Sequence, residues 1–216
     1  MHIPDGYLSS EVCAVTNVGA AGILGYAAVR ARDELDEARV PLVGATAAMV
    51  FALQMLNFHV AGGTSGHLLG AVLATVLLGP WLGMLVVSVV LGVQAFAFAD
   101  GGVAVLGANT LNMAVVGSLV TAAVLDGTKA LRARASGLLG VVAVAAWVSV
   151  IAAATATSIE LAVSGTIPLA TVLPAMLSVH ALIGVGEAAI SVAVVASVLA
   201  VRPDLVDGRR AAGVPA

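Results

Sequence analysis

The 216-residue chain contains little charge, few aromatic side chains and a single cysteine. Charged residues make up 10% of it and hydrophobic residues 61%, and the mean hydropathy is +1.11. Soluble domains contain about 25% charged residues, so this composition excludes an ordinary soluble domain and indicates an integral membrane protein. The lone Cys13 excludes an internal disulfide and a cysteine-rich metal site. Because the net charge is −3 and no run of basic residues occurs, we expect no nucleic-acid partner.

The hydrophobic runs predict an all-α, polytopic membrane protein with about seven transmembrane helices in the lipid bilayer. Stretches rich in Ala, Val, Leu and Gly are typical of spanning helices, whereas a barrel requires strands of alternating polarity. The expected segments are 11–31, 40–58, 67–79, 81–98, 108–130, 137–159 and 175–201. We interpret residues 1–216 as a single integral membrane domain, with an N-terminal loop 1–10, a helical bundle 11–201 and a short tail 202–216.

The nine basic residues lie in three clusters that orient the bundle. The clusters follow the first, fifth and seventh segments and consist of Arg30, Arg32 and Arg39; Lys129, Arg132 and Arg134; and Arg202, Arg209 and Arg210. After seven crossings all three share one face, which the positive-inside rule makes cytoplasmic. We therefore expect the N-terminus outside and the C-terminus in the cytoplasm. The outer loops then carry no basic residue and form a mildly acidic rim that favours an arriving cation; its acidic residues are Asp5, Glu11, Asp100 and Glu160.

The first two residues can form a chelating group for a metal ion. The free α-amine of Met1, together with the amide nitrogen and imidazole of His2, can close five- and six-membered rings on one ion. One more imidazole would complete a square of nitrogens, a field that suits Ni²⁺ and Cu²⁺, with Co²⁺ behind them in affinity. His67 is the favoured fourth ligand because ligating groups at the membrane boundary are expensive and tend to be functional. His59 is the alternative.

Three further polar residues are expected to support this site without binding the ion. Ser65, Asn109 and Asn112 belong to stretches that share the outer face with His2. The two asparagine side chains are suited to bonding the backbone of the N-terminal loop and so to positioning its ligands.

Four other polar side chains interrupt apolar helices. His180 and Glu187 lie two helical turns apart in the last segment. They predict either a proton relay or second site, or a buried hydrogen-bonded pair that holds helices together. Gln54 and Gln94 are lone amides, and we expect them to form packing hydrogen bonds.

Three motifs resemble a known family of membrane proteins. "MHIPDG" at the start, "GGTSGHLLGAVLATVLLGPWLGML" at 62–85 and "LGANTLNM" at 106–113 resemble the substrate-binding membrane component, of CbiM/NikM type, of energy-coupling-factor transporters for cobalt and nickel. The resemblance implies a seven-helix bundle whose N-terminus is threaded into an outward-facing pocket. It also implies that Met1, His2 and His67 hold the transported Co²⁺ or Ni²⁺, with no other cofactor.

The resemblance further implies partners and a location in the prokaryotic plasma membrane. The expected partners are a transmembrane coupling protein, two cytoplasmic ATPase subunits and, in some systems, a small auxiliary membrane subunit. No GxxxxGK[ST] phosphate loop occurs in the chain, so we expect a binding subunit and not an enzyme. The chain ends soon after the seventh segment, without the extra region fused in some nickel versions, which slightly favours cobalt.

Two alternatives from other classes remain. "GTSG" at 63–66 fits the GxSG pattern of rhomboid-like intramembrane serine proteases, with Ser65 as nucleophile and His180 as base. That interpretation leaves the start of the chain unexplained. A solute-coupled secondary transporter would use His180 and Glu187, but no strong pair of internal halves is evident.

Overall fold

The computed structural model describes residues 1–32, 34–35, 37–61 and 63–206. Arg209 and Arg210, Gly62 of the glycine-rich motif and most of the expected tail lie outside the described residues. The elements, in chain order, are α1 Ser10–Ala31, α2 Val40–Gln54, β1 Asn57–His59, β2 Ser65–His67, α3 Ala71–Leu78, α4 Pro80–Phe98, α5 Leu106–Thr110, the π-helix η1 Leu111–Val116, α6 Gly117–Gly127, the 3₁₀ helix η2 Lys129–Ala133, α7 Ala135–Val163, α8 Leu169–Val201 and the 3₁₀ helix η3 Pro203–Leu205.

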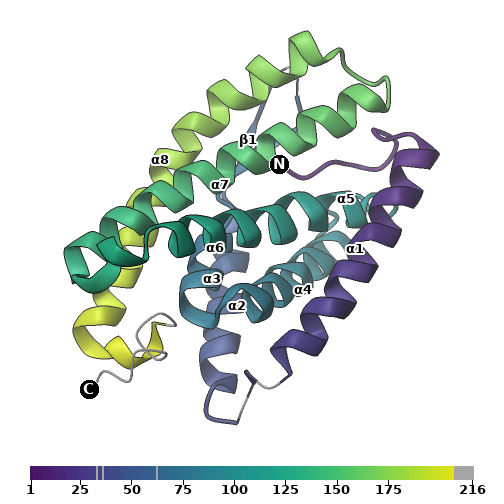
Figure 1. Cartoon of the computed structure of the whole chain (residues 1–216). Helices are drawn as coiled ribbons and strands as arrows, with labels where there is room; N and C mark the ends of the chain where they lie inside the picture. Colours follow the sequence, from purple (N-terminus) through teal and green to yellow (C-terminus); the bar gives the residue numbers. More distant parts are fainter. Residues whose placement is uncertain (33, 36, 62, 207–216) are drawn as a thin grey trace.

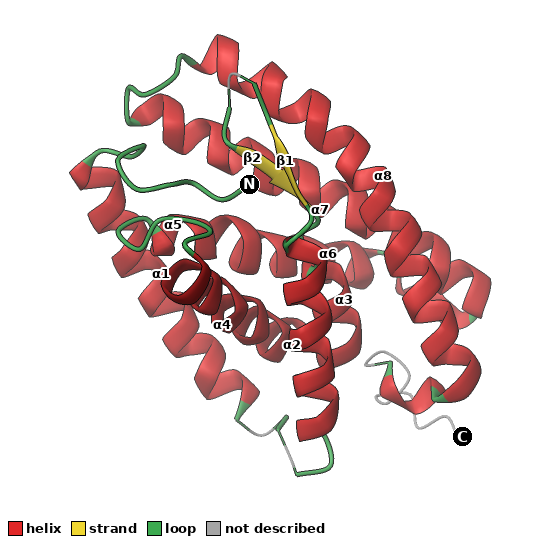
Figure 2. Ribbon diagram, turned by 180° about the vertical axis from the view of Figure 1, so that it is seen from behind, coloured by secondary structure: helices red, strands yellow, loops and turns green. Residues whose placement is uncertain are grey.

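The helices form a bundle in which the chain runs back and forth between two ends (Figures 1 and 2). Within the described residues, five apolar helices are long enough to cross a membrane, and α5, η1 and α6 together make one of them, Leu106–Gly127. Helix α2 has 15 residues and α3 only 8. The predicted all-α, polytopic membrane fold is confirmed, with one small two-stranded sheet added to it.

Short helix α3 lies inside the bundle and not against lipid. All eight of its residues are buried, and Gly83 of α4 approaches so closely that a Cβ there would lie 2.8 Å from the backbone of Ala74. A helix too short to span is tolerated at membrane depth when surrounding protein covers it. The expected third segment, 67–79, is therefore wrong at its start, because residues 65–67 form a strand and the helix begins only at Ala71.

The second expected segment also ends too late. Helix α2 stops at Gln54, and Asn57–His59 pairs antiparallel with Ser65–His67, so that Asn57 faces His67 and His59 faces Ser65. The glycine-rich stretch between the strands allows the chain to turn back, and the strand pairing satisfies backbone groups that would otherwise be unpaired. We call residues 57–67 the hairpin.

The last two helices are longer than expected and pack along most of their length. Helix α7 covers Ala135–Val163 and not 137–159, and α8 begins at Leu169 and continues through Pro174 where we expected 175–201. Gly184 of α8 lies against Trp147 of α7, and the Trp147 indole N–H donates to the carbonyl of Ala181 at 3.1 Å. Small residues at helix contacts of this kind permit close packing in lipid.

The two ends of the bundle have different contents. At one end the chain's first residues join the central core, where Met1 and Ile3 are fully buried with Leu69 and Met176. At the other end lie the turns that carry the described basic residues, and Leu138, Val195 and Val206 pack there in a second cluster. We call these the N-terminal end and the basic end (Figure 1).

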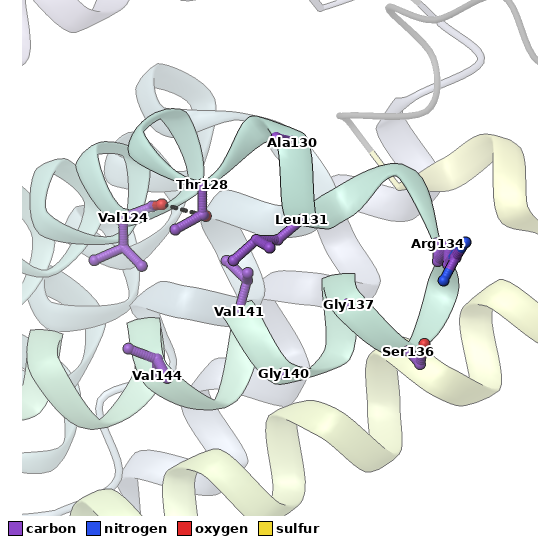
Figure 3. A pocket seen from close by; sticks show the side chains of 10 residues that line it. All are labelled: Val124, Thr128, Ala130, Leu131, Arg134, Ser136, Gly137, Gly140, Val141 and Val144. Carbon is purple, nitrogen blue, oxygen red and sulfur yellow. Dashed lines mark hydrogen bonds between the residues drawn. The ribbon is translucent and has the colours of Figure 1, made fainter.

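A groove of about 670 Å³ opens at the basic end between α6, η2 and α7 (Figure 3). Its lining is largely apolar, with Arg134 and Ser136 at one side, and consists of Val124, Thr128, Ala130, Leu131, Arg134, Ser136, Gly137, Gly140, Val141 and Val144. This groove contains none of the residues that the sequence predicts to bind metal.

Candidate metal centre

The N-terminal segment enters the bundle as an extended chain and ends inside it. Met1 and Ile3 are 0% exposed and His2 is 4% exposed. Burying side chains the size of Met and Ile stabilises the fold by about 1.5–3 kcal/mol each. The hydrophobic effect therefore holds the terminus inside the protein, and the polar groups of the first two residues enter with it.

Asn109 fixes the backbone of the buried segment. Its Oδ1 accepts from the Ile3 N–H at 2.8 Å, and its Nδ2 donates to the Ile3 carbonyl at 3.0 Å. One amide thus satisfies both polar groups of a residue that no helix or sheet pairs. This is the loop-positioning contact expected for Asn109.

The loop after α4 closes over the same segment. Gly102 N–H donates to the Ile3 carbonyl at 2.9 Å, and the Asp5 carboxylate accepts from the N–H groups of Val103 and Ala104 at 3.2 and 2.9 Å. A Cβ on Gly102 would overlap the Asp5 side chain, so only glycine permits this approach. The segment is consequently held on both sides, by Asn109 and by this loop.

The His2 imidazole lies among three polar side chains from distant parts of the chain. Its ring stacks on the His67 ring, with centroids 4.4 Å apart and planes 25° apart. Its Nε2 is 3.2 Å from Gln94 Oε1, and its Nδ1 is 3.2 Å from Asp100 Oδ1. The Gln94 amide oxygen and the Asp100 carboxylate can both only accept, so each favours a proton on the ring nitrogen that it faces, and Nδ1 becomes available to an ion only when it leaves Asp100.

His67 presents a free nitrogen toward this group. Its Nδ1 is 2.8 Å from the carbonyl of Leu68, which can only accept, so Nδ1 carries the proton. Its Nε2 is buried and has no hydrogen-bond partner among the described residues. Leaving a buried polar atom unpaired costs about 1–3 kcal/mol. A metal ion would satisfy that nitrogen, and the second ring nitrogen is already held as metal-binding histidines require.

The Met1 amine completes the group. It donates to Ser65 Oγ at 3.1 Å, so the Ser65 side chain contacts the proposed chelating amine. Burial lowers the pKa of this amine well below its ordinary value, although the charge on Asp100 opposes the shift. Burial also lowers the pKa of His2 and lowers the pKa of His67 strongly. All three nitrogens are therefore biased toward the neutral form that can bind a metal.

Side chains alone do not make a metal site here. In the part of the chain that the structure describes, no group of three His, Cys, Asp or Glu side chains is arranged to hold an ion. An ion at this position would need the terminal amine and a backbone amide as well, which is the chelate predicted from Met1 and His2.

Two of the expected residues take other positions. The Asn112 side chain does not hold the N-terminal loop as expected, because its Nδ2 donates to Glu160 of α7 at 2.6 Å. His59 is exposed on β1, where it faces Ser65 across the hairpin. Asn112 lies in the π-helical turn η1, and such turns are frequent near functional sites.

Sequence reasoning missed the two side chains that flank the His2 ring. Gln94 was expected to form a packing bond, as Gln54 does with the carbonyl of Leu69 at 2.7 Å, and Asp100 was treated only as part of an acidic rim. Gln94 lies in the last turns of α4 and Asp100 directly follows the helix, where its N–H bonds to the Gln94 carbonyl at 3.1 Å. Two polar residues at the end of an otherwise apolar helix were the available signal.

Glu187 and His180 are both buried, but they do not bond to each other as a pair. The two Glu187 oxygens accept from the N–H groups of Leu69 and Gly70 at 2.6 Å each. These N–H groups lie at the start of α3, where a carboxylate is favoured by the unpaired donors and the helix dipole. Gly70 has φ +73°, a conformation that favours glycine. Glu187 thereby ties α8 to the segment that carries His67.

The fold and this group of nitrogens define a multi-pass membrane protein with an inward-threaded, nitrogen-rich N-terminus. Residues 2–205 match the model of the family described as "Cobalt uptake substrate-specific transmembrane region", CbiM. The chain belongs to the CbiM family.

Individual relatives agree with this assignment. A fused NikMN protein of Archaeoglobus fulgidus is 38% identical over 213 residues, which is 99% of this chain and 70% of the relative. The "Fused nickel transport protein NikMN" of Rhodobacter capsulatus is 49% identical over 57% of this chain and 36% of the relative. The "Cobalt transport protein CbiM" of Sorangium cellulosum is 39% identical over 55% of this chain and 54% of the relative. The matched regions of the last two thus span about half or less of those relatives.

A solved structure shares the fold. The "Crystal Structure of an Truncated Transition metal Transporter" superposes with a TM-score of 0.87 at 33% identity, covering 93% of this chain and 99% of that chain.

Proposed function

We propose that this protein is the substrate-capture component of an ATP-driven energy-coupling-factor importer for Co²⁺ or Ni²⁺. One observation carries the proposal: the buried Met1 amine and His2 ring lie beside a His67 Nε2 that has no partner among the described residues. Membership of the CbiM family and the names of the nickel and cobalt transport relatives support the same cargo.

The ion would be bound by four nitrogens in a square. Met1 supplies its amine, His2 its amide nitrogen and Nδ1, and His67 its Nε2. The amine must leave Ser65, and His2 Nδ1 must leave Asp100. Because the two imidazole rings are stacked, at least one of them must turn before both can direct a lone pair at the same ion. Gln94 stays bonded to Nε2 and keeps Nδ1 available.

The choice of ions follows from the donors. Nitrogen donors in a plane suit Cu²⁺ and Ni²⁺, with Co²⁺ behind them in affinity, whereas Mg²⁺ and Ca²⁺ require oxygen ligands. Deprotonation of the His2 amide adds a negative charge that reduces the charge of a divalent ion in the buried site. The same donors accept both cobalt and nickel, so the proposal includes either ion.

Transport needs partners that use ATP, because the sequence contains no phosphate-loop motif. We infer a transmembrane coupling protein and two cytoplasmic ATPase subunits. The basic end carries the turns that contain the described arginine and lysine residues. By the positive-inside rule, this end faces the cytoplasm. The N-terminal end then opens to the outside of a prokaryotic plasma membrane, from which the ion enters.

The protease alternative has no support in the geometry. A serine nucleophile needs a hydrogen bond to its base. Ser65 Oγ accepts from the Met1 amine, while His180 Nδ1 bonds to the carbonyl of Met176 at 2.7 Å and His180 Nε2 has no partner in the described parts of the chain.

Replacement of His67 by Ala tests the proposed site. The variant keeps three nitrogens of the square, so we expect Ni²⁺ and Co²⁺ to bind at least about tenfold more weakly, the scale of losses on weakening a ligand set. Equilibrium dialysis of detergent-purified protein measures this. His59→Ala is the matched control, because His59 lies exposed on the same hairpin and should leave affinity unchanged. Equal affinity in wild type and His67→Ala for both ions would remove His67 from the site.

A further inference from the structure

His180 of α8 is prepared as a metal ligand in the same way as His67. In each ring Nδ1 is bonded to a backbone carbonyl, Leu68 at 2.8 Å for His67 and Met176 at 2.7 Å for His180. A carbonyl can only accept, so both rings carry their proton on Nδ1 and a lone pair on Nε2. Both Nε2 atoms are buried without a hydrogen-bond partner among the described residues. The four-nitrogen square uses His67 and leaves His180 with no role.

The His180 ring is near the proposed square but is not one of its ligands. Its helix lies against the hairpin that carries His67, because a Cβ on Gly66 would lie 2.7 Å from Ile183 and 3.4 Å from Val179 of α8. Yet within the described residues no three His, Cys, Asp or Glu side chains are close enough to share one ion. An ion held by His180 would thus occupy a separate, neighbouring position.

A second soft donor lies on the same face of α8. Met176 precedes His180 by one helical turn, so their side chains are neighbours on the helix surface. Both residues are 0% exposed, and Thr64 Oγ1 of the hairpin is 3.9 Å from the Met176 sulfur. A Cβ on Gly63 would lie 2.7 Å from that sulfur, so the hairpin backbone covers the Met176 side chain closely.

We propose that His180 Nε2 and Met176 Sδ form a second, weaker site for a soft or borderline transition-metal ion, next to the four-nitrogen square. Imidazole and thioether donors favour Cu⁺, Co²⁺ and Ni²⁺ and disfavour Mg²⁺ and Ca²⁺. The ion passes between this site and the square during uptake. Only this last step depends on the proposed function; the existence of the second site does not.

A diamagnetic probe separates the two sites. Cu⁺ is selected by thioether donors and has little tendency to displace an amide proton. We would label the methionine methyl groups with ¹³C, assign the Met176 signal with Met176→Leu, and titrate Cu⁺ under anaerobic conditions. We expect the Met176 methyl resonance to shift in wild type and in His67→Ala. His180→Leu and His180→Gln should weaken this response at least about tenfold. Met84→Leu, a buried methionine on α4, is the matched control and should respond as wild type does.

The Cu⁺ titration tests the second site independently of any transport activity. The second site would be overturned if the Met176 methyl resonance did not shift when Cu⁺ is added to wild type. It would also be overturned if the resonance shifted equally in folded His180→Leu and His180→Gln proteins. Loss of the response in both variants, with the Met84→Leu response retained, would support it.

Uptake tests the passage of the ion. In cells that also express the partner subunits, His180→Leu should reduce uptake of radioactive Co²⁺ or Ni²⁺ at least about fivefold, while affinity for the square stays within about twofold of wild type. Normal uptake by His180→Leu beside active wild type would show that the ion does not use this site. If wild type itself shows no uptake, the proposed function fails and the Cu⁺ result still stands.

Discussion

The N-terminal end and the basic end of the bundle differ in what their polar side chains contact. At the N-terminal end Gln94, Asn109 and Glu187 are at most 2% exposed and bond to other parts of the chain. At the basic end Lys129 and Asp126 form an ion pair at 3.1 Å with side chains 69% and 68% exposed. Buried, satisfied networks fix positions to fractions of an ångström, whereas exposed ion pairs contribute little. The proposed metal site thus lies at the end whose polar side chains are buried and hydrogen-bonded, whereas the paired charges of Lys129 and Asp126 at the basic end are exposed.

Arg39 is the exception at the basic end. It is 6% exposed, and its guanidinium donates to the carbonyls of Glu34 at 2.7 Å and Leu78 at 3.2 Å. Leu78 is the last residue of α3, so this cation lies at the negative end of a helix dipole. Glu187 occupies the opposite, positive end of the same helix. Charges of opposite sign thus hold α3 at its two ends.

Insertion of one alanine between Met1 and His2 should give the largest effect, at the N-terminal end. The tail would then contain an amine, two amides and an imidazole, which fill a square without His67. We expect retained Ni²⁺ chelation but loss of uptake, because an ion that does not bridge tail and bundle cannot distinguish two protein states. Uptake of radioactive nickel or cobalt in cells with the partner subunits measures this. Normal uptake by the insertion variant would contradict the role given to second-position histidine.

The pH dependence of Ni²⁺ affinity should distinguish the protein from its own N-terminal peptide. Burial lowers the pKa values of the Met1 amine and of His2, so in the protein both are already neutral near pH 7 and binding releases about one proton, from the amide. In a free MHIPDG peptide the amine, with a pKa near 8, is still protonated and binding releases about two.

Affinity should therefore rise about tenfold per pH unit in the protein and about a hundredfold in the peptide, between pH 6.5 and 7.5. Calorimetry in buffers of different ionisation enthalpy counts the protons directly. Equal slopes for protein and peptide would mean that the buried amine is charged when the ion arrives.

Glu187→Gln should have an intermediate effect. The neutral amide keeps one acceptor oxygen and turns a donor toward the N–H groups of Leu69 and Gly70, so about 1.5–3 kcal/mol of charge-assisted bonding is lost. For a chain of this size we expect a thermal midpoint lower by several degrees, on the order of 2–4 °C per kcal/mol. Glu37→Gln, at an exposed position of the basic end, is the control and should leave the midpoint unchanged. Equal midpoints in the two variants would show that the carboxylate does not hold α3.

Lys129→Ala should have the smallest effect. Its exposed ion pair is expected to contribute less than about 0.5 kcal/mol. Thermal unfolding and Ni²⁺ affinity of the purified variant should both match wild type. A loss comparable to that of Glu187→Gln would contradict the contrast between the two ends.

Much of the fold could be predicted because it depends on local properties. Spanning helices need long apolar runs, and the runs give α1, α4, α7 and their neighbours within a few residues. The hairpin and the short α3 could not be predicted from hydropathy. Hydropathy places residues 67–79 in one helix, whereas the helix begins only at Ala71, after N–H groups that bond to Glu187, a residue distant in sequence.

The candidate site likewise has one part that could be predicted from the sequence and one part that could not. Met1 and His2 are adjacent in the chain, so their chelating geometry is visible without a structure, and it remains a prediction until an ion is measured there. The contacts of His2 with Gln94 and Asp100 join residues 92 or more positions apart, and no periodicity encodes them. Asn109 was found and Asn112 was misplaced, although they are neighbours on one helix, because a π-helical turn changes which way successive side chains point.

The buried terminus has a consequence for how the protein is made. The Met1 amine bonds to a residue 64 positions later in the chain, and Ile3 bonds to one 106 positions later. The nitrogens of residues 1 and 2 can therefore reach their final places only after α5 has been synthesised and inserted. A truncated chain that stops before Asn109 would hold the first two residues of the site but not the clamp on Ile3, so the positioned chelate requires a chain that extends at least through α5.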